Sequence, residues 1–261
     1  RYGCMASEIE RKQDDLGRFG LGMKAASLSQ CRNLTVVSFD TNSNLNAYTW
    51  DYVYIQKKQD WIVQELTENE ISKLPYINSL IENKKGTLVL WQDFDVISKS
   101  SDGQVYETLI DLRKSLEKTL ALIYHRFLSQ TTTSKLKIYI NKQSVKPLDP
   151  FLEHHPKTTY KKERTIAIND SEGKERLIYI KPFVLPFATD MSESDKKLIG
   201  GIENLRTKQG FYIYRNNRLI IWGTWFGMKP RAELTKNARI RVDIPNSLDD
   251  IWGIDIKKQN A

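Results

Sequence analysis

Apolar residues recur with two different periods along the chain, and these periods predict both strands and helices. Alternating or β-branched apolar stretches predict strands at 34–39, 47–55, 61–66, 87–91, 136–140, 164–168 and 177–186, and a hairpin at 210–222. Helix-forming stretches and a helical apolar spacing predict helices at 23–31, at 68–83 with a break at Pro75, and at 105–127. The mixture of both periods predicts an α+β fold.

The most informative stretch runs from Gly17 to Leu28. Glycines at positions 17, 20 and 22 lead directly into good helix formers. Glycines let the backbone approach a ligand closely, and the first turn of the helix presents unpaired N–H groups. The stretch therefore predicts a site for an anion, of which phosphate is the commonest. A glycine turn that only caps the helix is the simpler alternative, and the third glycine and Lys24 weigh against it.

The same stretch resembles the end of the ATP lid in the GHKL ATPases, the superfamily of gyrase B, the heat-shock chaperones, the histidine kinases, MutL and MORC. It is most similar to the MORC and chaperone version, and Gly86-Thr87 with the strand after it resembles a second box of the superfamily. The resemblance implies a nucleotide-binding role for Gly17, Arg18, Phe19, Gly20, Leu21, Gly22, Met23 and Lys24. It also implies that Thr87 helps to hold the adenine-recognising acid and its water, with an ordinary strand residue as the alternative.

The second half of the chain resembles the transducer domain that follows the ATPase domain in MORC, MutL and gyrase B. The hairpin at 210–222, with Asn216-Asn217 at its tip, carries this similarity. The resemblance implies the C-terminal part of an ATPase domain at 1–130, built as a two-layer α/β sandwich in which a mixed sheet is backed by helices. At 131–261 it implies an α+β transducer of the ribosomal-protein-like left-handed βαβ type. It also implies that Lys257 or Lys258 contacts the terminal phosphate as a catalytic lysine, with a solvated lysine pair as the alternative.

Two earlier boxes of the superfamily are not found in the sequence: a helix with a Glu base and a Mg²⁺-binding Asn, and an Asp-x-Gly-x-Gly loop that reads adenine. The first residue is Arg1, and we expect the chain to lack the beginning of its ATPase domain. The resemblance implies that the intact protein binds ATP and Mg²⁺, dimerises when ATP is bound and hydrolyses the nucleotide. The main Mg²⁺ ligand is then expected upstream of this chain.

The composition leaves a second hypothesis open. A net charge of +8 permits a nucleic-acid partner, and Arg215 and Arg218 on the hairpin are candidates for contacts with DNA phosphates. A nucleic-acid-binding or scaffold protein would keep the fold without ATP turnover. Cys4 and Cys31 form no disulfide framework or metal-ligand spacing, so we expect small buried residues, a cytoplasmic location and no metal site made by the histidines or cysteines of this chain. No apolar run has the length of a membrane span.

Overall fold

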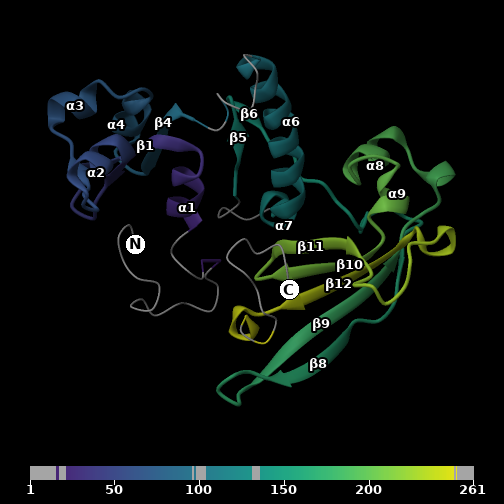
Figure 1. Ribbon diagram of the computed structural model, residues 1–261. Coiled ribbons are helices and arrows are strands. Elements are labelled where there is room, and N and C mark those ends of the chain that lie inside the picture. Colours follow the sequence, from purple (N-terminus) through teal and green to yellow (C-terminus); the bar gives the residue numbers. More distant parts are fainter. Residues whose placement is uncertain are drawn as a thin grey trace. The chain divides into compact units, whose positions relative to one another are not determined.

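The computed structural model describes residues 16–17, 22–95, 97, 104–130, 136–249 and 251. The chain packs into two compact units, one of residues 21–110 and the other of residues 1–20 and 111–261. Both units contain helices as well as strands (Figure 1), which confirms the predicted α+β class.

The unit of residues 21–110 is built on a four-stranded sheet with the strand order β3-β2-β1-β4. Its strands are β1 (Cys31–Phe39), β2 (Leu45–Asp51), β3 (Gln64–Glu65) and β4 (Thr87–Phe94). All three pairings are antiparallel. Strand β1 is central because it pairs with both β2 and β4, and this explains why its residues Leu34 and Val37 are fully buried.

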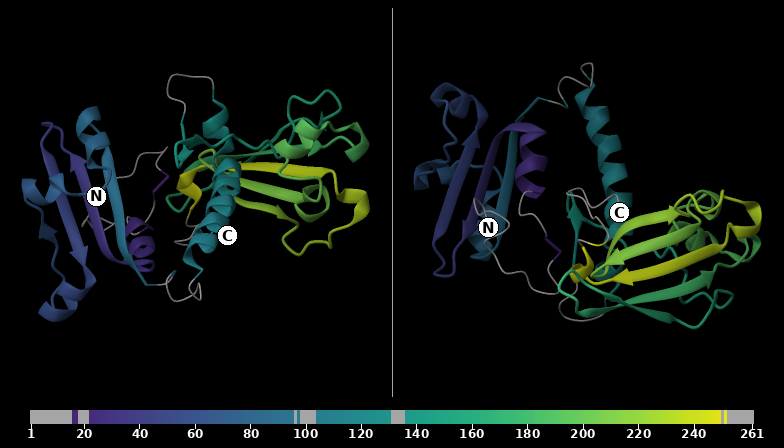
Figure 2. Two further views of the ribbon diagram at one scale, coloured as in Figure 1. Left: turned by 90° about the horizontal axis from the view of Figure 1, so that it is seen from above. Right: turned by 60° about the horizontal axis from the view of Figure 1, so that its bottom comes forward.

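Each face of this sheet packs against helices (Figure 2). The helices of the unit are α1 (Gly22–Leu28), α2 (Tyr52–Lys58), α3 (Glu68–Ser72) and α4 (Ile77–Asn83). Val37 and its neighbours on β2 and β4 pack against Ile71 of α3 and Leu80 of α4. Neighbouring strand residues point to opposite faces, so Leu34 and its partner Trp91 lie on the face toward α1.

The strand predicted at 47–55 ends earlier, at Asp51, and this prediction was wrong for its second half. The Asp51 carboxylate accepts a hydrogen bond from the backbone N–H of Tyr54 at 3.0 Å and caps helix α2. The aromatic and β-branched residues after Asp51 are typical of a strand, but the N-cap overrides that local preference. The break at Pro75 is confirmed, because α3 ends at Ser72 and α4 begins at Ile77.

The other unit is built on a larger sheet with the strand order β11-β10-β12-β9-β7, and β8 also pairs with β9. Its strands are β7 (Thr159–Tyr160), β8 (Arg164–Asn169), β9 (Glu175–Val184), β10 (Gly210–Arg215), β11 (Arg218–Thr224) and β12 (Ala238–Ile244). Strands β10 and β12 are parallel, and the other described pairs are antiparallel. The predicted hairpin is confirmed: Asn216 and Asn217 form its tip, with φ of 46° and 64°.

Helices and short segments complete this unit. They are α6 (Val105–Ile123), which begins in the other unit, α7 (His125–Ser129), β5 (Tyr139–Ile140), β6 (Gln143–Ser144), α8 (Glu193–Leu198), α9 (Asn204–Thr207), and the 3₁₀ turns Ala188–Asp190, Glu233–Thr235 and Asn246–Leu248. The helix predicted at 105–127 is divided at Tyr124, which has non-helical backbone angles.

Two apolar cores cover the two faces of the larger sheet. On one face, Tyr212 and Tyr214 pack with Phe151 and Phe183, and Leu122 of α6 packs against this cluster. On the other face, Ile213 packs with Val242 and Leu248. Because Ile213 lies between the two tyrosines, the alternation of strand β10 divides its side chains between these cores.

A neutral histidine is buried beside the first of these cores. His125 Nε2 lies 2.7 Å from the hydroxyl oxygen of Tyr214, and the Arg126 guanidinium stacks 3.7 Å above the Tyr214 ring. Burial, together with the charges of Arg126 and Arg241, lowers the pKa of His125 to about 3. The uncharged imidazole is therefore the form that fits the folded protein.

This burial predicts a loss of stability in mild acid. Because the folded-state pKa of His125 lies below its unfolded value near 6.5, only the unfolded chain takes up this proton as the pH falls from about 6.5 toward 3. The histidine should lower the free energy of unfolding by about 1.4 kcal/mol for each pH unit in the middle of this range. Urea unfolding at pH 7, 6 and 5 checks this, and the His125→Gln variant should lose less stability over the same steps. Equal slopes for both proteins would contradict the prediction.

Candidate functional site

The glycine motif ends at the first residue of helix α1. Gly22 begins the helix and is exposed, and a Cβ atom built on it would have no heavy atom within 4 Å. Met23 is 41% exposed, and the first turn of α1 carries no acidic residue. The N-terminal N–H groups of this helix therefore have no carboxylate in their own first turn to pair with.

The other predicted residues of the motif are only partly covered by the structure. Gly17 is described and exposed, whereas Arg18, Phe19, Gly20 and Leu21 lie outside the described residues. The backbone of Lys24 lies in α1, but its side chain is outside the described part of the structure. Their roles toward a nucleotide stay predictions.

Helix α1 is fixed to the sheet by a hydrogen bond that the sequence did not indicate. The indole Nε1–H of Trp91 on β4 donates to the Ser27 hydroxyl oxygen at 2.8 Å, and Ser27 is fully buried. Cys31 donates its Sγ–H to the Ser27 carbonyl oxygen at 3.3 Å and is 3% exposed. Cys31 is thus the small buried residue that was predicted, while Cys4 lies outside the described residues. These bonds hold the helix that follows the glycines in one position on β4.

Thr87 is the first residue of β4, as the Gly86-Thr87 box predicted. Its hydroxyl lies 2.8 Å from the hydroxyl of Ser38 on β1, and Ser38 Oγ also donates to the Gly86 carbonyl oxygen at 3.2 Å. Gly86 has φ of +112°, a conformation that favours glycine. The local geometry explains why a glycine and a hydroxyl residue stand together here, and the adenine-side role of Thr87 stays a prediction.

The chain immediately before Gly17 is held by a buried arginine. Arg215, at the end of β10, donates from Nη1 to the Leu16 carbonyl oxygen at 3.1 Å. Its Nε and Nη2 atoms contact the two carboxylate oxygens of Asp249 at 2.5 and 2.7 Å. The Arg215 and Asp249 side chains are 1% and 2% exposed, so this bidentate ion pair is shielded from water.

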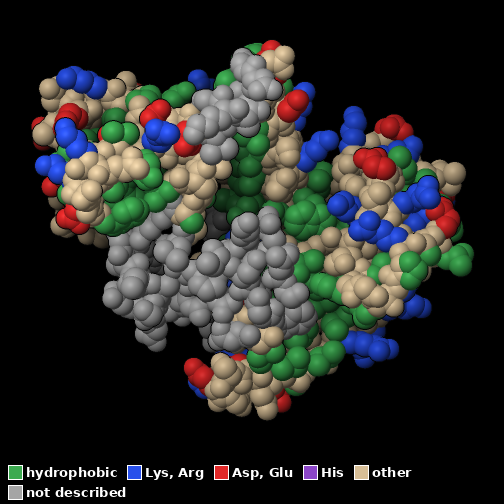
Figure 3. All heavy atoms as spheres, in the orientation of Figure 1, with side chains coloured by type: hydrophobic (Ala, Val, Ile, Leu, Met, Phe, Trp, Pro, Cys, Tyr) green, Lys and Arg blue, Asp and Glu red, His purple; other side chains and the backbone are tan. Residues whose placement is uncertain are grey.

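This placement corrects the expectation that Arg215 lies on an exposed basic face. Its guanidinium is buried because Asp249 and the Leu16 carbonyl satisfy it inside the unit. Arg218 is half-buried, and its guanidinium carbon lies 5.6 Å from the centre of the Tyr124 ring. On the face shown in Figure 3, Lys and Arg side chains are dispersed with Asp and Glu between them. The predicted lysines Lys257 and Lys258 lie outside the described residues.

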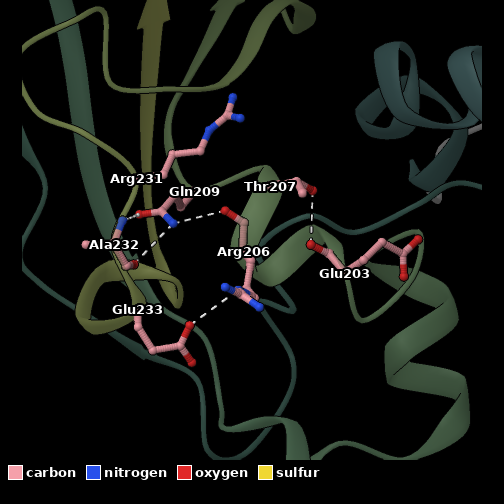
Figure 4. A pocket seen from close by; sticks show the side chains of 7 residues that line it. All are labelled: Glu203, Arg206, Thr207, Gln209, Arg231, Ala232 and Glu233. Carbon is pink, nitrogen blue, oxygen red and sulfur yellow. Dashed lines mark hydrogen bonds and ion pairs between the residues drawn. The ribbon is translucent and has the colours of Figure 1, made fainter.

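A separate pocket of about 390 Å³ lies in the unit with the larger sheet (Figure 4). Gln209 Nε2 donates to the carbonyl oxygens of Arg206 and Ala232, and Arg206 forms an ion pair with Glu233 at 3.4 Å. Gln209 also accepts hydrogen bonds from Trp225 and Thr235. These polar groups are paired with one another, so their hydrogen bonds stabilise the fold around the pocket.

The described residues lack two other kinds of feature. They contain no group of three or more His, Cys, Asp or Glu placed to hold a metal ion. In that same part of the chain, no helix combines the length and the apolar character needed to cross a bilayer.

Comparison with known proteins finds a family match for the first third of the chain. Residues 1–87 match the family described as "Histidine kinase-, DNA gyrase B-, and HSP90-like ATPase". The match confirms the predicted GHKL resemblance for the residues that it covers. A search of curated proteins found no match.

One solved structure similar to the chain is the ATPase region of Saccharomyces cerevisiae topoisomerase II bound to ICRF-187 (dexrazoxane). The sequence identity is 11% and the TM-score is 0.38, with 94% of this chain and 57% of that chain covered. The protein described here thus spans somewhat more than half the length of that structure.

The anchoring of α1 generates a prediction about stability. Replacing Ser27 with Ala removes the acceptor of the Trp91 indole N–H, and we expect the free energy of unfolding to fall by about 1–2 kcal/mol. Urea unfolding followed by tryptophan fluorescence measures this change. The control is Ser29→Ala, because Ser29 is exposed and its hydroxyl contacts only its own helix and Gln30. A Ser27→Ala protein as stable as this control would contradict the anchoring role.

Proposed function

We propose that this chain forms part of the ATP site of a GHKL-type ATPase, and that the glycine motif ending at Gly22 binds the nucleotide phosphates. The observation that carries the proposal is the exposed start of α1. Gly22 leaves open space beside the unpaired N–H groups of the first turn, and that turn has no acidic side chain to repel a phosphate. The family match over residues 1–87 supports ATP as the source of the phosphate.

The residues present fit the phosphate end of ATP. Backbone N–H groups at Gly22 and Met23 would donate to phosphate oxygens, and Lys24 is the nearest cation in sequence. Anchoring through Ser27 and Trp91 keeps these donors in place before the nucleotide arrives, which lowers the cost of ordering on binding. Thr87 on β4 is proposed for the adenine side, where its hydroxyl would help to hold an acid and a water.

The wider cycle is also proposed from the superfamily resemblance. ATP would bind with Mg²⁺, close a lid and bring two protomers together, and residues 131–261 would act as the transducer that follows residues 1–130. Lys257 or Lys258 would stabilise charge on the terminal phosphate and so report its presence to the second half of the chain. Mg²⁺ would neutralise phosphate charge, and its main ligand is expected outside this sequence.

The first test is Gly22→Ala. The added Cβ has no heavy atom within 4 Å and Gly22 has no left-handed φ, so the fold should tolerate the change. The methyl group would instead occupy the space proposed for a phosphate, and we expect ATP affinity to fall at least roughly tenfold. Titration calorimetry with Mg-ATP measures this, and the double variant Gly20→Ala, Gly22→Ala should bind no ATP. The control is Ser29→Ala, an exposed position in the turn directly after the same helix. Unchanged affinity in Gly22→Ala at unchanged thermal stability would contradict the proposal.

A second test concerns turnover. The sequence contains neither the Glu base nor the Mg²⁺-binding Asn of the superfamily, so the 261-residue chain should release phosphate from ATP very slowly. A chain extended at its N-terminus by the natural upstream sequence should hydrolyse ATP measurably faster. Phosphate release from both chains, at equal concentration, provides the comparison. Robust turnover by the 261-residue chain would contradict this account.

A further inference from the structure

Three stretches that are distant in sequence meet at Arg215. The Arg215 guanidinium bonds to the carboxylate of Asp249, just after the last described 3₁₀ turn, and to the carbonyl of Leu16, the residue before Gly17. Arg215 itself ends strand β10, beside the tip of the hairpin. All three residues belong to the unit of residues 1–20 and 111–261.

The junction formed by Arg215, Asp249 and Leu16 requires one arrangement of its atoms because Arg215 is buried. The Arg215 side chain is 1% exposed, and a guanidinium in such a place requires acceptors along its planar fork. Asp249 fills two positions of the fork, and this leaves Nη1 directed at the Leu16 carbonyl oxygen at 3.1 Å. The backbone at Leu16 is therefore held by a charge-assisted bond, and its place depends on both the hairpin and the segment that carries Asp249.

A second ion pair in the same unit differs from the Arg215–Asp249 pair in the segments that it contacts. Arg126 also pairs with an aspartate, Asp243 on β12, and one of its bonds measures 3.2 Å. The Arg126 guanidinium stacks on Tyr214 and reaches Asn217, so its contacts stay within α7 and the large sheet. Arg215 adds a bond to the chain that leads into the glycine motif.

We propose that Arg215, oriented by Asp249, is a positioning residue for the start of the glycine motif. It fixes the backbone at Leu16, the residue before Gly17, and thereby ties that point of the chain to the packing of β10 and the segment after β12. This inference rests on the proposed ATP site, but the position of Leu16 can be measured without any nucleotide. Coupling through such a junction works in both directions, because a ligand that stabilises one segment stabilises the others through the shared bonds.

The test compares Arg215→Lys and Asp249→Asn with Arg126→Lys in the whole 261-residue chain. Lysine keeps the charge but loses the planar fork, and asparagine weakens the hold on Arg215 with little change in shape. Hydrogen exchange without nucleotide should become roughly tenfold faster in peptides spanning residues 16–17 in the first two variants. Mg-ATP affinity should fall roughly tenfold in the same two variants. Arg126→Lys should show neither effect, even where its thermal stability falls as much.

The outcomes separate the two proposals. Faster exchange around Leu16 in a chain whose unsubstituted form binds no Mg-ATP would support the junction and overturn the proposed function. Unchanged exchange in Arg215→Lys would overturn the junction. Equal acceleration in Arg126→Lys at matched thermal stability would overturn it as well, because the effect would then reflect general loosening of the unit.

Discussion

The buried ion pair between Arg215 and Asp249 holds the end of β10 against the residue that follows the last described 3₁₀ turn, and Arg215 also bonds to Leu16, far away in sequence. Breaking a buried pair by removing one partner leaves an uncompensated charge, which typically costs about 3–5 kcal/mol. Such a pair tolerates few alternative arrangements, so it selects one geometry for the strand end, the 3₁₀ turn and the chain before Gly17. The apolar cluster beneath it, with Ile213, Val242 and Leu248, supplies most of the burial but has no comparable directional requirement.

The other unit shows the same division between non-specific and directional forces. Val37 and the residues of α3 and α4 form an apolar layer on one face of the small sheet. On the other face, the hydrogen bond from Trp91 to the buried Ser27 places helix α1 at a defined point along β4. A short helix gains little stability from its own backbone bonds, so this tertiary contact determines where the start of α1 lies.

The features predicted well from the sequence are those with local causes. Pro75 breaks a helix, and Asn216-Asn217 form a tight hairpin tip, because the backbone angles of these residues are restricted or unusually permitted. The strand predicted at 47–55 was wrong beyond Asp51, since an N-cap competes with the strand preference of the following residues.

The contacts that the sequence did not predict are long-range. The Ser27–Trp91 and Arg215–Asp249 contacts join residues 64 and 34 positions apart, and no periodicity in one sequence reports such pairs. The glycine motif indicated the GHKL resemblance because close approach of the backbone to a ligand favours one residue type, glycine, whereas Arg215 in the sequence is indistinguishable from a surface arginine.

The place of β12 in the large sheet has a consequence for how the protein is made. β12 lies between β10, to which it is parallel, and β9, although it is the last of the sheet's strands in sequence. During synthesis, β9 and the β10–β11 hairpin leave the ribosome before the strand that joins them, so their backbone edges stay unpaired until residue 244 has emerged. Cotranslational folding of this sheet must therefore wait until β12 has emerged, and a ribosome stalled shortly before β12 would present two open strand edges to chaperones or to other nascent chains.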